Sequence, residues 1–169
     1  MTQTLILAMH GLPVPDQALG LREDLPAAEW QWIERLRQPQ DRLRSLVGRA
    51  MARRLLGAHL GQAAAAVRLT STQHGKPVLD TPAGQPPGWH FNIAHSGDEV
   101  LVAVGPQPLG IDVEVCPRTI EPGLLRLVMG ADRDLEGLDL PQAFCAEWVC
   151  REAILKACGL GLTIEPGGL

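Results

Sequence analysis

The stretch FNIAHSGDEVLVAVGPQPLGIDVEV, residues 91–115, decides how this chain is expected to fold. It contains two apolar runs, EVLVAVG (99–105) and LGIDVEV (109–115), and the residues GPQP connect them. Apolar runs of this length, bounded by Gly and Pro, are typical of strands joined by a turn. We therefore predict a hairpin whose strands are buried on at least one face, with His95 in a turn before it.

The segments on both sides of this hairpin mix strands with helices. Helical periodicity, with Pro in the first turn of a segment and Gly just after its end, marks the helices. The exposed connection before the last helix is expected at 130–140. The predicted strands are 4–9, 66–72 and the short piece 77–79; the predicted helices are two within 27–60 separated near Pro39, one at 120–129 and one at 141–159.

The composition fits one compact unit. The chain has 169 residues, of which 46% are hydrophobic, so it is long enough to bury a core of its own. It has no apolar run of about 18 residues and no basic leader at its start, so we expect a soluble, cytoplasmic protein without a membrane partner. The net charge of -4 argues against a nucleic-acid partner. The four cysteines lack metal-ligand spacing.

Basic residues concentrate in one short segment. Arg42, Arg49 and Arg53 share a face if this segment is helical, because offsets of seven and eleven residues return to nearly the same angle. Such a stripe suits an acidic partner or phosphates, and the other interpretation is a solvated helix face. The segment holds seven of the fifteen basic residues: Arg35, Arg37, Arg42, Arg44, Arg49, Arg53 and Arg54.

Two carboxylates alternate in the segment GIDVEV. If this segment is a strand, Asp112 and Glu114 project to the same side, because alternate residues of a strand share a face. Two neighbouring acids repel unless a cation lies between them, and Mg²⁺ commonly takes one or two carboxylates together with water and substrate phosphate. The pair indicates either a magnesium site or the polar outer face of a half-buried strand.

A third carboxylate, Glu152, lies on the last predicted helix, near an apolar stripe that includes Trp148. A buried acid is costly unless it is paired or bound to a metal, so Glu152 is a candidate metal ligand or general base. An ion pair with Arg151, or a helical salt bridge with Lys156 four residues later, would also account for it.

Two lysines and one histidine are further candidate site residues. The chain has only two lysines, Lys76 in HGKP and Lys156 in the last helix, among otherwise Arg-based cations. This usage hints that a compact point charge is needed at both places. His95 could contact phosphate or act as a base near neutral pH, and it could equally be a structural residue of its turn.

Five motifs in one order resemble those of the 4'-phosphopantetheinyl transferases, in the larger monomeric class typified by the enzyme that activates surfactin synthetase. The resemblance covers roughly residues 40–162. The last motif is close to the WxxKEAxxK form, with Arg151 where the family usually has lysine. The motifs are RSLVG (44–48), STQHGKP (71–77), FNIAHSG (91–97), LGIDVEV (109–115) and WVCREAILKACGLGL (148–162).

The resemblance implies a function and a fold. Members move the phosphopantetheine arm of coenzyme A onto a serine of an apo acyl- or peptidyl-carrier protein and release adenosine 3',5'-bisphosphate. The implied fold is α+β, in two halves related by a pseudo-twofold, each with a mainly antiparallel sheet. Residues 1–105 would form the half that contacts the nucleotide, and residues 106–169 a half that looks shortened at its C-terminus. A monomer with its site in the cleft between the halves is expected.

The resemblance also implies roles for individual residues. Asp112, Glu114 and Glu152 would hold Mg²⁺ against the pyrophosphate of coenzyme A. Glu152 or a metal-bound water would deprotonate the acceptor serine, and Lys156 would contact the pyrophosphate. The positions that match the family's contacts to the adenosine end, its 3'-phosphate and the diphosphate are Arg44, Lys76 and His95, with Gly75 and Pro77 shaping the adjacent loop.

Two departures from the family pattern favour other functions. Ala94 replaces a serine expected to donate a hydrogen bond to a phosphate, and the chain ends soon after its last helix. Together with Arg151, these departures suit a degenerate relative that binds coenzyme A or carrier protein without turnover. The retained acids and Lys156 oppose that reading. A metal-dependent phosphohydrolase would use the same acids, but it leaves the HGKP and NIAHS motifs unexplained.

Overall fold

The computed structural model describes residues 5–13, 18–73, 75–82, 88–130, 136–137 and 139–159. The expected connection at 130–140 therefore lies largely outside the described residues. So do His74 of the second motif and residues 160–162 of the last one.

A three-stranded antiparallel sheet forms the centre of the molecule. It contains β1 (Leu5–His10), β4 (His90–Ser96) and β5 (Glu99–Gly105), in the order β1-β5-β4. The central strand β5 pairs with β1 on one side and with β4 on the other. The strand expected near residues 4–9 is confirmed by β1.

The predicted hairpin between 99–105 and 109–115 is wrong. The hairpin partner of β5 is β4, and a two-residue turn at Gly97 and Asp98 joins them. His95 therefore lies in a strand, where a turn was expected. The polar residues of β4 make its sequence resemble that of a loop. The more apolar segment 109–115, in contrast, forms no backbone ladder.

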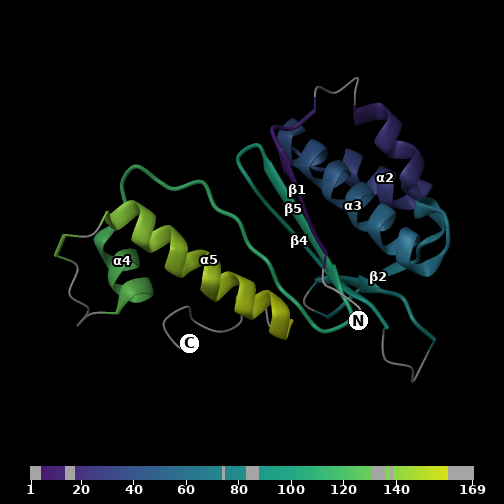
Figure 1. The fold of residues 1–169 in the computed structure, drawn as a ribbon. Coiled ribbons are helices and arrows are strands. Elements are labelled where there is room, and N and C mark those ends of the chain that lie inside the picture. Colours follow the sequence, from purple (N-terminus) through teal and green to yellow (C-terminus); the bar gives the residue numbers. More distant parts are fainter. Residues whose placement is uncertain are drawn as a thin grey trace.

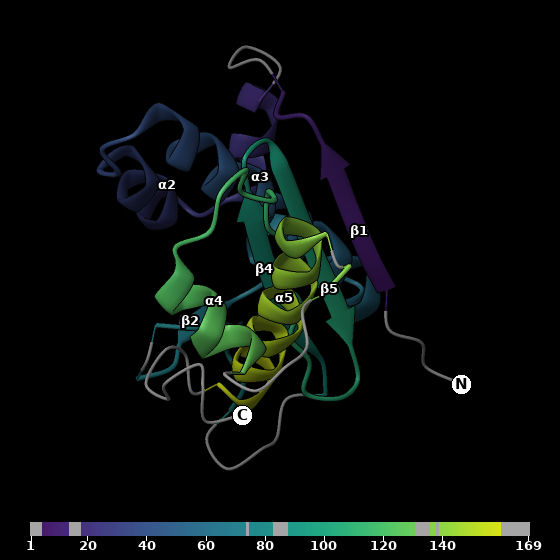
Figure 2. The same ribbon diagram turned by 90° about the vertical axis from the view of Figure 1, so that its left-hand side faces the viewer.

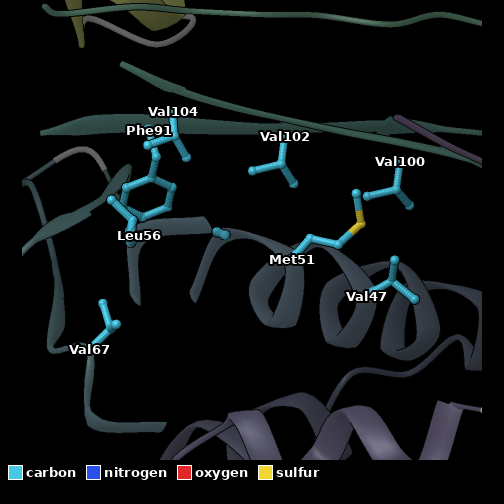
Figure 3. Packing of buried hydrophobic residues seen from close by; sticks show 9 residues of the cluster. Val47, Met51, Leu56, Val67, Phe91, Val100, Val102 and Val104 are labelled. Carbon is cyan, nitrogen blue, oxygen red and sulfur yellow. The ribbon is translucent and has the colours of Figure 1, made fainter. Parts of the chain in front are cut away.

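Helices α2 (Ala27–Glu34) and α3 (Pro39–Leu60) cover one face of the sheet (Figure 1). Proline fits the first helical position because its missing N–H has no partner there in any case, and the predicted separation of the two helices near Pro39 is confirmed. Apolar side chains of α3 pack against those of β5 to form the main core (Figure 3). Its labelled members include Val47, Met51 and Leu56 from α3, Phe91 from β4, and Val100, Val102 and Val104 from β5.

Two helices occupy the other side of the sheet. Figure 2 shows α5 (Leu140–Cys158) in front of the strands, with α4 (Pro122–Met129) beside it. Both helices were predicted. In the part of the chain described after Gly105 there are helices but no strand, so the second sheet is not found there, and the two pseudo-twofold halves stay a prediction.

Short strands and 3-10 helices lie between the longer elements in the sequence. The strands β2 (Leu69–Ser71) and β3 (Pro77–Leu79) form a small antiparallel pair, which confirms the expected strand at 77–79 and, in shortened form, the one at 66–72. The 3-10 helices η1 (Leu19–Asp24) and η2 (Ala64–Ala66) flank α2 and α3 in sequence. Of the helices that the structure describes, none has both the length and the apolar character needed to cross a membrane.

The arginine stripe of α3 has an internal partner. Arg49 and Arg53 both pair with Glu29 of α2, and the Arg53 side chain is only 3% exposed. The Arg53 guanidinium also donates to the carbonyl of Val67 beyond η2. Neither expectation for these two arginines, an external acidic partner or a solvated face, is correct, because their charge fastens α2 and the segment after α3 to α3.

Candidate functional site

The segment that carries Asp112 and Glu114 runs beside β4 and is held there by side chains. The Asn92 Oδ1 accepts a hydrogen bond from the Ile111 amide at 2.8 Å, and the Ser96 Oγ accepts one from the Val115 amide at 3.1 Å. Both ends of these bonds advance by four residues in the same direction. The segment therefore runs parallel to β4 without joining the backbone ladder.

The other side of this segment touches α5. A Cβ at Gly110 would lie 2.0 Å from the carbonyl oxygen of Ala153 and 2.4 Å from the amide nitrogen of Ala157. No side chain fits in that space, so glycine allows the backbone of the segment to approach the helix. The contact places the next residues of the segment opposite the last two turns of α5.

An ion pair joins the segment to the helix. The Nζ of Lys156 donates to the Oδ1 of Asp112 at 2.5 Å, and the Asp112 side chain is only 9% exposed. Lys156 is thus paired with Asp112, and not, as the helical spacing suggested, with Glu152. Arg151, a second expected partner of Glu152, forms an ion pair with Glu147 at 3.1 Å.

Glu152 belongs to the same charged group. Burial raises the pKa of Glu152, the Lys156 ammonium opposes this rise, and the negative charge of Asp112 adds to it. The two carboxylates therefore lie close enough to repel each other, and the single Lys156 ammonium offsets one of their two negative charges. A carboxylate whose pKa is raised in this way is a better proton acceptor than an ordinary surface acid.

Glu114 is hydrogen-bonded to β4. Its carboxylate accepts a hydrogen bond of 2.5 Å from the Ser96 hydroxyl of β4. Among the residues described, no group of three His, Cys, Asp or Glu side chains is gathered as a metal site. The structure thus brings Asp112 and Glu152 together but leaves Glu114 with Ser96. Two carboxylates still fit Mg²⁺, which completes its coordination with water and phosphate oxygens.

A cavity of about 240 Å³ opens beside this group. Gly75 and Pro77 of the HGKP motif lie on its wall, and Lys156 reaches it from α5. Sequence reasoning grouped these residues, and the structure brings them together. The complete lining is Gly75, Lys76, Pro77, Asn92, Ile93, Lys156 and Gly159.

The loop that supplies Gly75 is closed by its own hydrogen bonds. The Gly75 amide donates to the Thr72 carbonyl, and the Thr72 amide donates to the Lys76 carbonyl, both at 2.9 Å. Gly75 has a φ of 80°, a left-handed conformation that side chains disfavour. The glycine of the motif therefore serves the turn that presents Lys76 and Pro77 to the cavity.

Lys76 fastens the end of α5. Its ammonium donates to the Leu109 carbonyl at 3.3 Å and to the carbonyl of Lys156. Burial lowers the pKa of Lys76. The lysine thus connects the HGKP loop, the start of the Asp112 segment and the C-terminal turn of the helix, where cations are favoured.

Arg44 and His95 lie together near the C-terminal end of β4. The Arg44 Nε donates to the Gly97 carbonyl at 2.7 Å, and its Nη1 pairs with Asp41 at 3.0 Å. His95 is exposed, yet surrounding protein atoms partly desolvate it, which lowers the pKa of His95, and the nearby Arg44 charge lowers it further. The imidazole is therefore neutral near pH 7.

Ala94 does not border the cavity. Its side chain is only 1% exposed, and it lies on β4 between Asn92 and Ser96, on the same side of the strand. The residues that line the cavity do not include it. In this structure, a serine hydroxyl at the same position would be covered, so the substitution removes no donor from the cavity wall.

Sequence reasoning missed three residues of the site. Asn92 and Ser96 hold the Asp112 segment, and Gly110 lets it touch α5. Their only signal was the pair of polar residues Asn92 and Ser96, four positions apart in FNIAHS, and a glycine two residues before Asp112. The pattern became informative once β4 was known to be a strand.

Comparison with known proteins gives consistent matches. Residues 12–107 match the family model described as 4'-phosphopantetheinyl transferase, N-terminal. The chain is 32% identical to the 4'-phosphopantetheinyl transferase HetI of Nostoc sp., over 86% of this chain and 64% of that protein. It is 29% identical to the 4'-phosphopantetheinyl transferase of Bacillus subtilis, over 74% of this chain and 56% of that protein.

A vertebrate protein gives a similar match. The chain is 28% identical to the L-aminoadipate-semialdehyde dehydrogenase-phosphopantetheinyl transferase of Pongo abelii, over 82% of this chain and 53% of that protein. The chain thus spans between about half and two thirds of the length of these curated relatives.

Proposed function

This chain belongs to the 4'-phosphopantetheinyl transferase family, and from that premise we propose that it transfers the 4'-phosphopantetheine arm of coenzyme A to a serine of an apo acyl- or peptidyl-carrier protein. The observation that carries the proposal is the cavity walled by Gly75, Lys76 and Pro77, because Lys156 joins it to the Asp112 and Glu152 carboxylates. A nucleotide site and an acid–base group are thereby neighbours.

Binding of coenzyme A is assigned to the cations. Lys156 would contact the pyrophosphate, and Lys76 would border the nucleotide through the loop that it shares with Gly75 and Pro77. Arg44 and His95, which lie together near the end of β4, would bind the adenosine end and its 3'-phosphate. Charge-assisted hydrogen bonds to phosphate oxygens are about twice as strong as neutral ones, so arginine and lysine suit these roles.

The reaction is a displacement at phosphorus. The serine oxygen of the carrier protein attacks the β-phosphorus of coenzyme A, and the bond from this phosphorus to the bridging oxygen breaks. Adenosine 3',5'-bisphosphate leaves with that oxygen. Glu152 accepts the serine proton, for which its raised pKa suits it. Lys156 stabilises charge that develops on the phosphate oxygens.

Magnesium is part of the proposal. Asp112 and Glu152 would hold it, with Glu114 as a candidate third ligand once released from Ser96. A bound Mg²⁺ would neutralise charge on the pyrophosphate oxygens. The mutual repulsion of Asp112 and Glu152 supports a cation there, because a single ammonium from Lys156 offsets only one of their two charges.

The alternative, binding without turnover, rested partly on Ala94 and Arg151. Ala94 is buried away from the cavity, and Arg151 pairs with Glu147, so neither residue supports that alternative in this structure.

Calorimetric titration with coenzyme A and with 3'-dephospho-coenzyme A tests the substrate and its orientation. We expect coenzyme A to bind at least about tenfold more tightly, since the 3'-phosphate gains charge-assisted contacts. Arg44→Ala should abolish this preference, whereas Arg68→Ala, at an exposed arginine paired with Asp80, should preserve it. Equal affinity for both nucleotides would contradict the assignment of Arg44 and His95.

A further inference from the structure

Asn92 is a buried amide on β4 whose side-chain oxygen bonds a residue outside its strand. Its side chain is 4% exposed, and Asn92 and Arg53 are the polar residues of the described chain that are buried to this degree. Burying an amide is costly unless its polar atoms are bonded. The Asn92 Oδ1 accepts the hydrogen bond from the Ile111 amide at 2.8 Å.

That bond fixes the residue immediately before Asp112. The segment 109–115 has no backbone ladder to β4, so side chains determine its position on that side. Gly110 sets its distance from α5 on the other side. A shift of Ile111 would therefore move Asp112 relative to both Lys156 and Glu152.

We propose that Asn92 is a positioning residue, whose side-chain oxygen holds the Ile111 amide so that Asp112 meets Lys156 beside Glu152. The proposal rests on the proposed transferase function for its kinetic consequence, but its structural part is independent of turnover. Ser96 provides a second tie, at the Val115 end, and it also holds Glu114. Asn92 therefore governs Asp112, and Ser96 governs Glu114.

Amide hydrogen exchange of the whole chain without substrate tests the structural part. Asn92→Leu keeps the side-chain size and removes the acceptor, so exchange of the Ile111 amide should accelerate about tenfold, as expected for the loss of about one net hydrogen bond. The amides of β4 and β5 serve as an internal reference and should change by less than about twofold. Asn92→Asp retains an acceptor oxygen and should restore protection of the Ile111 amide.

Ser96→Ala is the matched control. It removes one of the two acceptors of the Val115 amide, the other being the Glu114 carboxylate at 3.1 Å. Exchange of the Val115 amide should therefore accelerate by less than about tenfold, while the Ile111 amide stays protected. Accelerated exchange throughout β4 and β5 in Asn92→Leu would overturn the proposal, because Asn92 would then be a residue of general core stability. Unchanged exchange at Ile111 would overturn it as well.

Kinetics separates positioning from substrate contact, since Asn92 also lines the cavity. In Asn92→Leu we expect kcat for carrier loading to fall about 10- to 100-fold, as displacement of catalytic groups by about 1 Å can cause, while the Kd of coenzyme A stays within about twofold. A raised Kd with unchanged kcat would make Asn92 a substrate contact and overturn the proposal. Absence of loading by the unsubstituted chain would refute the proposed function, and the exchange result would still decide the role of Asn92.

Discussion

Lys156 of α5 and Asp112 of the segment beside β4 form an ion pair, with 2.5 Å between Nζ and Oδ1, that joins the helical layer to the sheet. The same ammonium opposes the raised pKa of Glu152. One lysine thus serves two carboxylates, and the group retains a net negative charge when both are ionised. This balance suits a site that receives a cation together with a pyrophosphate.

Lys156→Ala should lower kcat/KM for carrier loading by about 100- to 1000-fold, the usual range when a donor to developing charge is removed. The loss also leaves Asp112 and Glu152 without their shared counter-ion. Lys156→Arg keeps the charge and should recover part of the rate. Steady-state loading kinetics with a carrier protein measures all three chains.

Arg151→Lys is the matched control on the same helix, because Arg151 pairs with Glu147 at 3.1 Å. It restores the residue usual in the family and should change kcat/KM by less than about threefold. A loss in Arg151→Lys as large as that in Lys156→Ala would contradict the assigned role of Lys156.

Glu152→Gln should make the folded chain more stable at neutral pH. Burial and Asp112 raise the pKa of Glu152 despite Lys156, so the folded state holds this proton more tightly than the unfolded state. The stability that the protonated form contributes is complete below about pH 4 and is lost as the pH rises through the raised value. Because glutamine does not ionise, Glu152→Gln does not lose this stability as the pH rises.

Urea unfolding across pH, with a chelator present to remove metal ions, measures this effect. The free energy of unfolding of Glu152→Gln should exceed that of the unsubstituted chain at pH 7.5, and the difference should shrink toward about pH 4. Glu23→Gln, at an exposed carboxylate, should show no such trend. A variant that is less stable at pH 7.5 would disprove the electrostatic account.

Glu114→Gln distinguishes the two roles open to this acid. In the structure its carboxylate accepts a hydrogen bond from Ser96, and it forms no three-residue metal group with other described acids. An amide oxygen can still accept that bond, so the substitution should reduce kcat/KM by less than about tenfold if this arrangement persists during turnover. Asp112→Asn, tested in parallel across a Mg²⁺ titration, should lose at least about 100-fold. Equal losses would make Glu114 a full metal ligand.

Glu29→Gln should destabilise the N-terminal helices strongly. Its carboxylate pairs with both Arg49 and the buried Arg53, so the substitution leaves a buried guanidinium without its counter-charge. Breaking such a pair costs about 3–5 kcal/mol. Asp24→Asn removes the pair with Arg54, whose side chain is 56% exposed, and should cost less than about 1 kcal/mol.

Guanidinium chloride unfolding compares these two variants directly. Similar losses of unfolding free energy in Glu29→Gln and Asp24→Asn would show that the Arg53 environment is not energetically special, contrary to its 3% exposure.

The helices and the outer strand were accessible from local sequence alone. Pro39 marks the start of α3, and Pro141 with Gly159 brackets α5, because proline and glycine have fixed positional preferences at helix ends. The HGKP loop could also be predicted, since glycine and proline so close together indicate a turn.

The central hairpin could not be predicted from the sequence, because residues 109–115 have the pattern of a strand and β4 has the pattern of a loop. Residues 109–115 alternate apolar and polar side chains as a strand does, but Asn92 and Ser96 replace their backbone partners. In β4, the polar residues Asn92, His95 and Ser96 weaken the apolar signal of a strand, although Asn92 and Ser96 bond the 109–115 segment. Contacts with residues far away in the sequence determine the structure of both segments, and local sequence patterns carry no information about such contacts.

The sequence was sufficient to predict which residues belong to the candidate site, but only partly how they are arranged in space. Sequence reasoning found Lys76, Asp112, Glu152 and Lys156, which the structure brings to one cavity and one charged group. It also grouped Glu114 with these acids, and among the described residues the three do not gather as a metal group, while Glu114 accepts a hydrogen bond from Ser96. Which of two alternate acids faces α5 depends on the path of the backbone beyond Gly110.

The most direct test of the central claim is a paired product measurement. The chain is incubated with coenzyme A, Mg²⁺ and an apo carrier protein, and the intact mass of the carrier is followed together with adenosine 3',5'-bisphosphate. The account predicts the mass gain of one phosphopantetheine arm per carrier, with an equal amount of the nucleotide released, and loss of both in Glu152→Gln. No mass gain on several carrier types from a folded chain, or nucleotide release without carrier loading, would contradict it.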